Sequence, residues 1–164
     1  MAEAEAAVRQ AERQLVVFEM GGESYAVEIG VVREIIRMQQ ITRVPSVSSS
    51  LEGVINLRGK LIAVVDLRKR LGIEAAEETR ESRIIVIDVE GEDMGAMVDA
   101  VTEVIRLPAN AVESQTELVA AADAQYVEGI AKLEERLVVL LDVKRILAAE
   151  DASVVAEAKE AVRR

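Results

Sequence analysis

Residues 53–60, GVINLRGK, form the segment most similar to a catalytic motif, the phosphate-binding P-loop GxxxxGK[ST]. The similarity fails at three points. Five residues instead of four separate Gly53 from Gly59, Leu61 stands where the Mg²⁺-binding Ser or Thr is required, and a strand-like apolar run follows where a helix is needed. We therefore predict no nucleotide binding here, and no cofactor.

A second candidate is a pair of carboxylates, Asp66 and Asp142, which hold equivalent positions in the repeat described below. Two carboxylates can share a proton, as in aspartic proteases. Neither is followed by the small residues that would expose such a carboxylate, and helix capping is the predicted role of both. The chain has no His and no Cys, which removes the usual general base, thiolate chemistry and the commonest metal ligands. We predict no catalytic residue and no metal site.

Arg58 is the residue for which binding chemistry is most plausible. It lies between Leu57 and Gly59 at the tip of a predicted hairpin, where an Arg side chain is not readily buried. A rigid turn there would present the planar guanidinium to a carboxylate or carbonyl group of a protein partner. The residues alone leave an ordinary exposed cation as the alternative.

An internal repeat provides the elements that would position these residues. Residues 52–71 recur in looser form at 128–147, and residues 16–38 recur at 85–107, in the same order in both halves. This order predicts a duplicated fold. The copies differ most at one turn, where Asn56, Arg58 and Gly59 in the first copy align with Lys132, Glu134 and Glu135 in the second.

Composition excludes several classes of function. A net charge of −10 at pH 7 and only three aromatic residues disfavour nucleic-acid binding, which needs clustered cations and stacking platforms. The charged, Ala-rich N-terminus does not look like a signal peptide, and no run of about 18 uncharged apolar residues follows. We expect a cytoplasmic protein without direct membrane insertion.

Short apolar runs separated by Gly-containing turns predict an all-β fold of two small barrels, since barrel closure hides strand edges. We expect a tail at 1–13, a first barrel subdomain at 14–78, a second at 79–148, and a charged helical tail at 149–164. Exchange of strands between the halves is left open. The apolar face of the last tail is thin, so we predict a solvated helix, with a partner-binding helix as the alternative.

Residues 53–72, GVINLRGKLIAVVDLRKRLG, closely resemble the CheW family of chemotaxis coupling proteins, as do the opening strand and Gly-Gly-Glu turn (15–25), the VREIIRM segment (32–38) and the RVPS loop (43–46). The resemblance covers about 14–148. It implies one CheW-like domain of two five-stranded SH3-like β-barrels. It also implies a non-catalytic adaptor that couples the cytoplasmic tips of chemoreceptors, the methyl-accepting chemotaxis proteins, to the regulatory domain of the histidine kinase CheA.

The resemblance also implies where partners bind. Receptor or kinase contacts are expected at Val32, Glu34, Gly53, Asn56, Arg58 and Gly59, and an adjoining groove at Val47 and Leu51. Further expectations are self-association in array rings and a location at the inner membrane, held there through receptor arrays. An adaptor of a different, non-flagellar chemosensory pathway is the main alternative. An enzyme using carboxylates or Lys, or a nucleic-acid-binding barrel, is the alternative from other classes.

Overall fold

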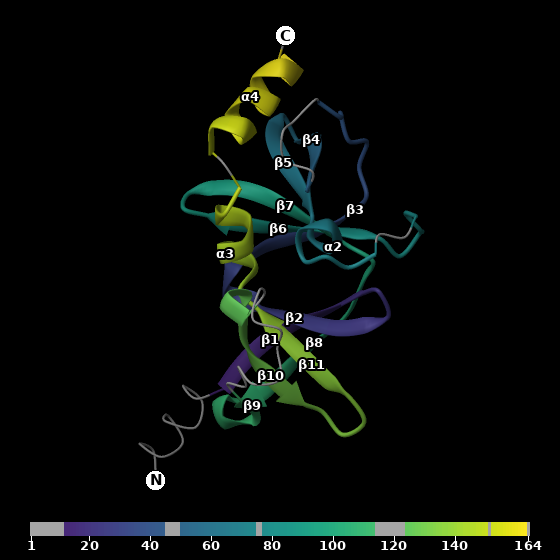
Figure 1. Ribbon diagram of the computed structural model, residues 1–164, viewed down its shortest axis with the longest axis vertical. Helices are drawn as coiled ribbons and strands as arrows, with labels where there is room; N and C mark the ends of the chain where they lie inside the picture. The colour runs from purple at the N-terminus through teal and green to yellow at the C-terminus, as the bar shows by residue number, and fades with distance from the viewer. Residues whose placement is uncertain (1–11, 45–49, 75–76, 114–123, 151, 164) are drawn as a thin grey trace.

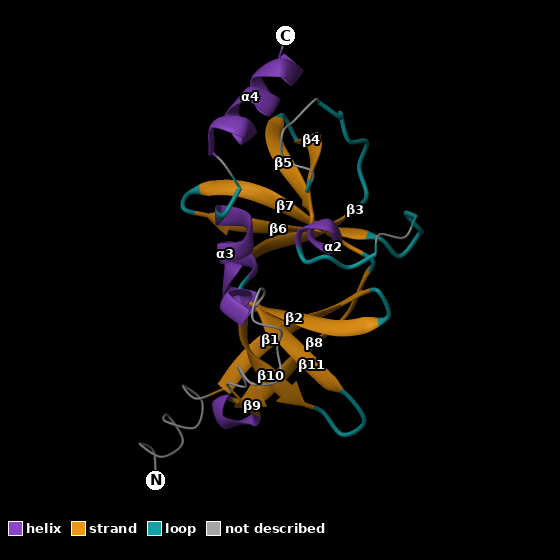
Figure 2. Ribbon diagram, in the orientation of Figure 1, coloured by secondary structure: helices purple, strands orange, loops and turns teal. Residues whose placement is uncertain are grey.

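The computed structural model describes residues 12–44, 50–74, 77–113, 124–150 and 152–163. Figure 1 shows two groups of strands along the long axis, with the C-terminal helix at one end of the molecule. Strands dominate the described residues and helices are few, which confirms the predicted all-β class (Figure 2). The strands are β1 (Glu12–Met20), β2 (Glu23–Glu28), β3 (Val32–Arg37), β4 (Leu51–Leu57), β5 (Lys60–Asp66), β6 (Arg83–Val89), β7 (Glu92–Val98), β8 (Ala100–Pro108), β9 (Val112–Glu113), β10 (Val127–Lys132) and β11 (Leu137–Leu141). The α-helices are α2 (Leu67–Arg70), α3 (Val143–Ala148) and α4 (Ala152–Arg163).

The strands form one six-stranded sheet, in the order β8-β1-β2-β11-β10-β9, and one five-stranded sheet, in the order β3-β6-β7-β5-β4. Each sheet combines strands from both halves of the repeat. The hairpin β1–β2 joins strands of the second half, and its repeat equivalent β6–β7 joins strands of the first half. The sheets therefore do not follow the expected division at residues 78 and 79. The exchange that the sequence left open is present, and it is symmetric: β1 pairs with β8 as β6 pairs with β3, and β2 runs parallel to β11 as β7 runs parallel to β5.

Neither sheet closes into a complete barrel. Within the described ranges no strand pairing joins β3 to β4 or β8 to β9. A single bridge between Thr42 and Val54 links the segment after β3 to β4. The implied SH3-like barrels are therefore open, and one has six strands instead of the expected five, because the short strand β9 adds to β10.

Both faces of the central strands are buried. Along β1, Leu15 and Val17 pack inside the six-stranded sheet, whereas Val16 and Phe18 point into a second core shared by both sheets. The same alternation occurs along β6, where even-numbered isoleucine and valine positions fill the five-stranded sheet and odd-numbered positions fill the shared core. Burial on both faces explains the continuous aliphatic runs in the sequence. It also means that the two sheets stabilise each other.

The predicted capping roles of the two aspartates are confirmed. The side chain of Asp66 accepts a hydrogen bond from the backbone N–H of Arg68 at the start of α2, and Asp142 accepts one from the N–H of Arg145 in α3. Side-chain oxygens at this position satisfy N–H groups that the helix itself leaves unpaired. The two carboxylates therefore have a structural role and do not form a catalytic dyad.

Gly53 and its repeat equivalent Gly129 both lie at bulges where a neighbouring segment approaches closely. A Cβ atom at Gly53 would lie 2.3 Å from the carbonyl oxygen of Thr42, and one at Gly129 would lie 2.8 Å from that of Glu113. Both glycines are buried. Their recurrence in the repeat is thus explained by backbone packing.

We expect Gly53→Ala to lower the free energy of unfolding by about 1–3 kcal/mol, the usual cost of overpacking. The added methyl group would push away the segment that exchanges two backbone hydrogen bonds, 2.8 and 2.9 Å long, between Thr42 and Val54. Urea unfolding followed by circular dichroism measures the loss. Gly30→Ala is the control for glycine removal without a steric clash, because nothing lies within 4 Å of its Cβ position and its φ is not positive. Equal losses in both variants would contradict the packing explanation.

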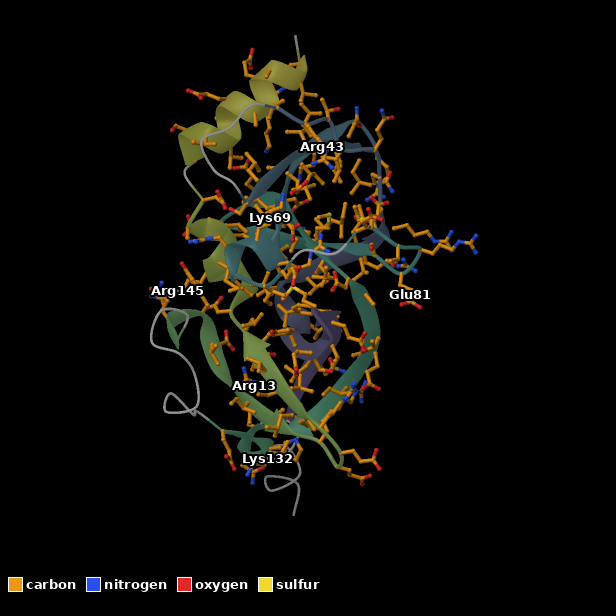
Figure 3. All side chains as sticks on the ribbon, turned by 45° about the vertical axis from the view of Figure 1, so that its right-hand side comes forward. Arg13, Arg43, Lys69, Glu81, Lys132 and Arg145 are labelled. Carbon is orange, nitrogen blue, oxygen red and sulfur yellow. The ribbon has the colours of Figure 1, made fainter. Side chains whose placement is uncertain are left out.

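Repeat-equivalent glutamates Glu52 and Glu128 are held in opposite electrostatic environments. Burial of Glu52 favours a higher pKa, but hydrogen bonds and charge from Lys69 and Arg43 outweigh it and lower the pKa. At Glu128, burial and the charge of Asp142 raise the pKa despite the nearby Arg13. Figure 3 labels these three cations, Arg43 and Lys69 around the five-stranded sheet and Arg13 on the six-stranded sheet.

The two glutamates should therefore change stability with pH in opposite directions. A carboxyl whose pKa is lowered by folding stabilises the protein above its unfolded pKa, about 4.3, and loses that contribution as pH falls through the folded value. Glu52→Gln should be less stable than the unmodified protein at pH 7, with the difference shrinking below about pH 4.3. Glu128 contributes stability below its unfolded pKa and loses it as pH rises, so Glu128→Gln should carry no such penalty at pH 7. Denaturant titrations between pH 3 and 7 test both variants. If the stability of both variants, relative to the unmodified protein, changed with pH in the same direction, the opposite pKa shifts of the two glutamates would be refuted.

The C-terminal helix α4 is docked, contrary to the expectation of a solvated tail. Val155 and Ala158 are buried, and Val154 and Val162 pack beside them against the shared core. The helix lies on β4 and β5. The apolar face is as thin as the sequence indicated, but a helix needs only this narrow stripe when a complementary sheet face is available.

Candidate protein-interaction site

The structure brings Glu34 of β3 and Arg58 of the β4–β5 turn into direct contact. Nη2 of Arg58 lies 2.5 Å from Oε2 of Glu34, although β3 and β4 are opposite edges of the five-stranded sheet. The Arg58 side chain is 69% exposed and that of Glu34 36%. The hydrogen bond and negative charge of Glu34 raise the pKa of the Arg58 guanidinium. The pair forms an exposed polar site across the two edges.

The turn that carries Arg58 has a defined backbone geometry. Leu57 pairs with Lys60, so Arg58 and Gly59 form a two-residue loop, with φ of 52° and 85°. Positive φ at both positions is typical of a type I′ turn, in which Gly is favoured and Arg is unusual. The side-chain oxygen of Asn56 accepts a hydrogen bond from the N–H of Gly59 at 2.8 Å. Asn56 and Gly59 therefore hold the turn, and Arg58 is the group it presents.

The β6–β7 turn is held in the same way, by a side-chain oxygen that accepts a hydrogen bond from the N–H of the turn glycine. The Asp88 side chain accepts a hydrogen bond from the N–H of Gly91 at 3.0 Å, and Glu90 has a φ of 51°. In the described residues, Arg58 and Glu90 are the only non-glycine residues with positive φ. A cation and an acid are thus displayed at the tips of two adjacent hairpins.

The repeat equivalent of the Arg58 turn has a different chemistry and a different backbone. Glu134 and Glu135 are exposed between Leu133 and Arg136, whose backbones exchange hydrogen bonds of 2.9 and 3.3 Å. Neither glutamate has a positive φ. Arg136 forms an ion pair with Glu103 of β8. The two copies therefore present opposite charges from equivalent hairpins on different sheets.

The other residues implied by the resemblance are distributed differently. Val32 is half-buried at the start of β3 and packs against the shared core. Gly53 is buried, and Leu51 is 6% exposed within the shared core, so neither offers a side chain to a partner. Val47 lies outside the described residues. Glu34, Asn56, Arg58 and Gly59 remain as a contiguous accessible set.

A cleft beside this set was not predicted. Its volume is about 960 Å³, and it lies between the β4–β5 and β6–β7 turns and the last turn of α4. Four separate segments line it: the segment after β3, the β4–β5 hairpin, the β6–β7 turn and α4. They contribute Thr42; Val54, Asn56, Gly59, Lys60 and Leu61; Gly91 and Glu92; and Lys159, Val162 and Arg163, respectively. The spacing of Val155, Ala158 and Val162 was the available signal that α4 packs against another element.

Charges around the cleft form ion pairs. Nε of Arg33 lies 2.9 Å from one carboxylate oxygen of Asp93, and Nζ of Lys60 lies 3.0 Å from the other. Burial favours a higher pKa for Asp93, but the two cations outweigh it and lower the pKa. Among the described residues there is no cluster of acids that could hold a metal ion. No helix in the described part of the chain is long and apolar enough to cross a membrane.

Comparison with known proteins identifies the type of domain. The family model described as a CheW-like domain matches residues 14–151. The chain is 37% identical over 139 residues to the chemotaxis protein CheW of Bacillus subtilis, an alignment that covers 85% of this chain and 89% of the relative. It is 34% identical over 138 residues to the chemotaxis protein CheW of Thermotoga maritima, covering 83% and 88% respectively.

A solved structure agrees with these relatives. The crystal structure of the scaffolding protein TtCheW from Thermoanaerobacter tengcongensis matches with a TM-score of 0.75 and 37% sequence identity, covering 82% of this chain and 86% of that one. The whole of α4 lies beyond the residues that the family model matches.

Proposed function

Because this chain belongs to the CheW-like domain family and is a non-catalytic adaptor of chemotaxis signalling, we propose that it couples the cytoplasmic tips of chemoreceptors to the histidine kinase CheA. The observation that supports this most directly is the Arg58–Glu34 pair. It joins two of the residues that the family resemblance implies as partner contacts, from two distant strands, in one exposed site.

The proposed mechanism is competition for a preoriented guanidinium. The fixed turn holds Arg58 outward. Little side-chain and backbone freedom is therefore lost when a partner carboxylate binds the guanidinium, either in place of Glu34 or together with it. Charge-assisted hydrogen bonds of this type fix the register of an interface. The surrounding apolar residues would supply the buried contact area that a protein–protein interface needs.

The exchanged fold gives the adaptor two different faces. Arg58 projects from the five-stranded sheet, and Glu134 and Glu135 project from the six-stranded sheet. Opposite charges on separate sheets suit simultaneous binding of two unlike partners, the regulatory domain of CheA and a receptor tip. Head-to-tail contacts between such faces can close into rings, which would hold the adaptor in cytoplasmic arrays at the inner membrane.

Binding to purified partners tests the proposal. Isothermal titration with a receptor signalling fragment, and separately with the CheA regulatory domain, should give saturable binding to both. Failure to bind either partner would refute it. Preferential binding of the receptors and kinase of a second, non-flagellar chemosensory pathway would place the adaptor in that pathway instead.

A further inference from the structure

The helix α4 occupies a sheet face next to the Arg58 turn. It packs on β4 and β5, the two strands whose connecting turn contains Arg58 and Gly59. Val54 of β4 and Leu61 of β5 belong to the same apolar cluster as Val155 and Ala158 of α4. Without α4 this apolar face would be open to solvent, and it would adjoin the exposed polar site.

The attachment of α4 is weak compared with that of α3. Val155 and Ala158 are the buried residues of α4, with Val154 and Val162 partly buried beside them, whereas α3 buries Val143, Ile146 and Leu147. One ion pair, from Lys159 to Glu92 of β7, adds to the contact of α4 with the sheet. Because buried apolar area is the main source of docking strength, α4 is held less firmly than α3.

The segment before α4 is anchored independently. Oγ of Ser50, which is 6% exposed, lies 2.5 Å from a carboxylate oxygen of Glu150, directly before the junction with α4. Release of α4 would thus leave α3 in place and would remove only the side chains of α4 itself from the shared core. The cleft at the far end of the helix, between its last turn and the hairpin tips, gives a second molecule access to the edge of this contact.

From these contacts we propose that the β4–β5 face is a surface for an amphipathic helix, that α4 occupies it in the free adaptor, and that a helix of the receptor tip displaces α4 on binding. The inference rests on the proposed function, because it assigns a place to one of the partners named there. The chemistry that suits the surface is that of α4 itself: small aliphatic residues at spacings of three and four, and among them a cation that can reach Glu92.

Amide hydrogen exchange of α4 is the decisive measurement. With the full chain and a purified receptor signalling fragment, protection of residues 152–163 should fall when the fragment binds. A rise would mean that α4 is part of the interface, and no change would mean that the fragment binds elsewhere. Either result would overturn the displacement proposal while leaving the adaptor function intact, since the titration described above tests that separately.

A charge reversal provides a second test that leaves the helix sequence almost intact. Lys159→Glu places two acids together at the contact with Glu92 and should release α4, tightening receptor-fragment binding about 3- to 10-fold if most free molecules have α4 docked. The double variant Lys159→Glu with Glu92→Lys restores an ion pair and should restore the original affinity. Lys144→Glu, an equal charge change at an exposed position of α3, is the control.

Truncation after residue 150 completes the series. It should tighten receptor-fragment binding at least as much as Lys159→Glu. Unchanged affinity in both variants, with α4 shown to be released by its hydrogen exchange, would refute the proposal. Displacement of α4 by the CheA regulatory domain but not by the helical receptor fragment would also refute it.

Discussion

Replacement of Arg68 by Ala is expected to lower the free energy of unfolding by about 3–5 kcal/mol, the cost of breaking a buried ion pair by removal of one partner. The side chain of Arg68 is 6% exposed and that of Asp66 1%. Two parallel hydrogen bonds join them, from Nε at 3.0 Å and from Nη2 at 2.9 Å. Without the guanidinium, the Asp66 carboxylate would remain buried and deprived of its charged partner.

The same guanidinium connects the two sheets, which is why a large loss is expected. Its Nη1 donates to Asp99 at 2.8 Å. Asp99 in turn accepts a hydrogen bond from the backbone N–H of Gly21 at 2.8 Å and donates its own N–H to the carbonyl of Glu19. Arg68 of α2 is therefore linked to the β1–β2 turn of the six-stranded sheet through one side chain.

Chemical denaturation with urea measures this effect. Arg68→Lys retains a charge but cannot form the paired hydrogen bonds, so an intermediate loss is expected. Arg80→Ala, at an exposed position, should stay within about 0.5 kcal/mol of the unmodified protein. A loss below about 1 kcal/mol for Arg68→Ala would show that the network contributes little to the junction.

Local features of the fold were predictable because they depend on neighbouring residues. The hairpin at Arg58-Gly59 follows from a Gly between apolar runs, and the short helices follow from Asp66 and Asp142 as caps. The exchange of hairpins between the sheets was not predictable. Both halves carry the same apolar alternation, so on sequence pattern alone β1 could pair with β3 as well as with β8.

The burial of Arg68 has the same explanation. The position two residues after a helix cap usually faces solvent, and the partner that helps to bury it, Asp99, lies 31 residues further along the chain. Docking of α4 likewise depends on the apolar face of β4 and β5 that it covers, and no residue within the helix indicates which face that is. Contacts of high sequence separation are therefore where prediction from pattern stops.

Residues of the candidate site that are close in the sequence were likewise predictable as a group, and those that are distant were not. Asn56, Arg58 and Gly59 lie in one turn and could be grouped from the sequence. Glu34 is 24 residues from Arg58, and only the family resemblance placed both at a contact before the structure joined them. The resemblance also included Gly53 and Leu51, which the structure buries, because a family pattern does not separate residues that build a turn from residues that the turn presents.

Charge reversal at the turn, Arg58→Glu, should weaken binding of the receptor fragment or the CheA regulatory domain about 10- to 100-fold, as expected for the loss of an interfacial Arg. The melting temperature should change little, because the side chain is 69% exposed and the turn is held by Asn56 and Gly59. Glu134→Ala, in the repeat-equivalent turn, should not weaken binding of the same partner.

Two further variants separate a direct contact from an indirect one. Arg58→Asn removes the guanidinium but suits positive φ, so it should weaken binding while leaving the turn intact or slightly more stable. The exchange Arg58→Glu with Glu34→Arg rebuilds the internal ion pair with its ends reversed. If Arg58 contacts the partner directly, this double variant stays defective, because a partner carboxylate then meets Glu at the turn. Recovery of full affinity would instead mean that the ion pair only maintains the shape of the site.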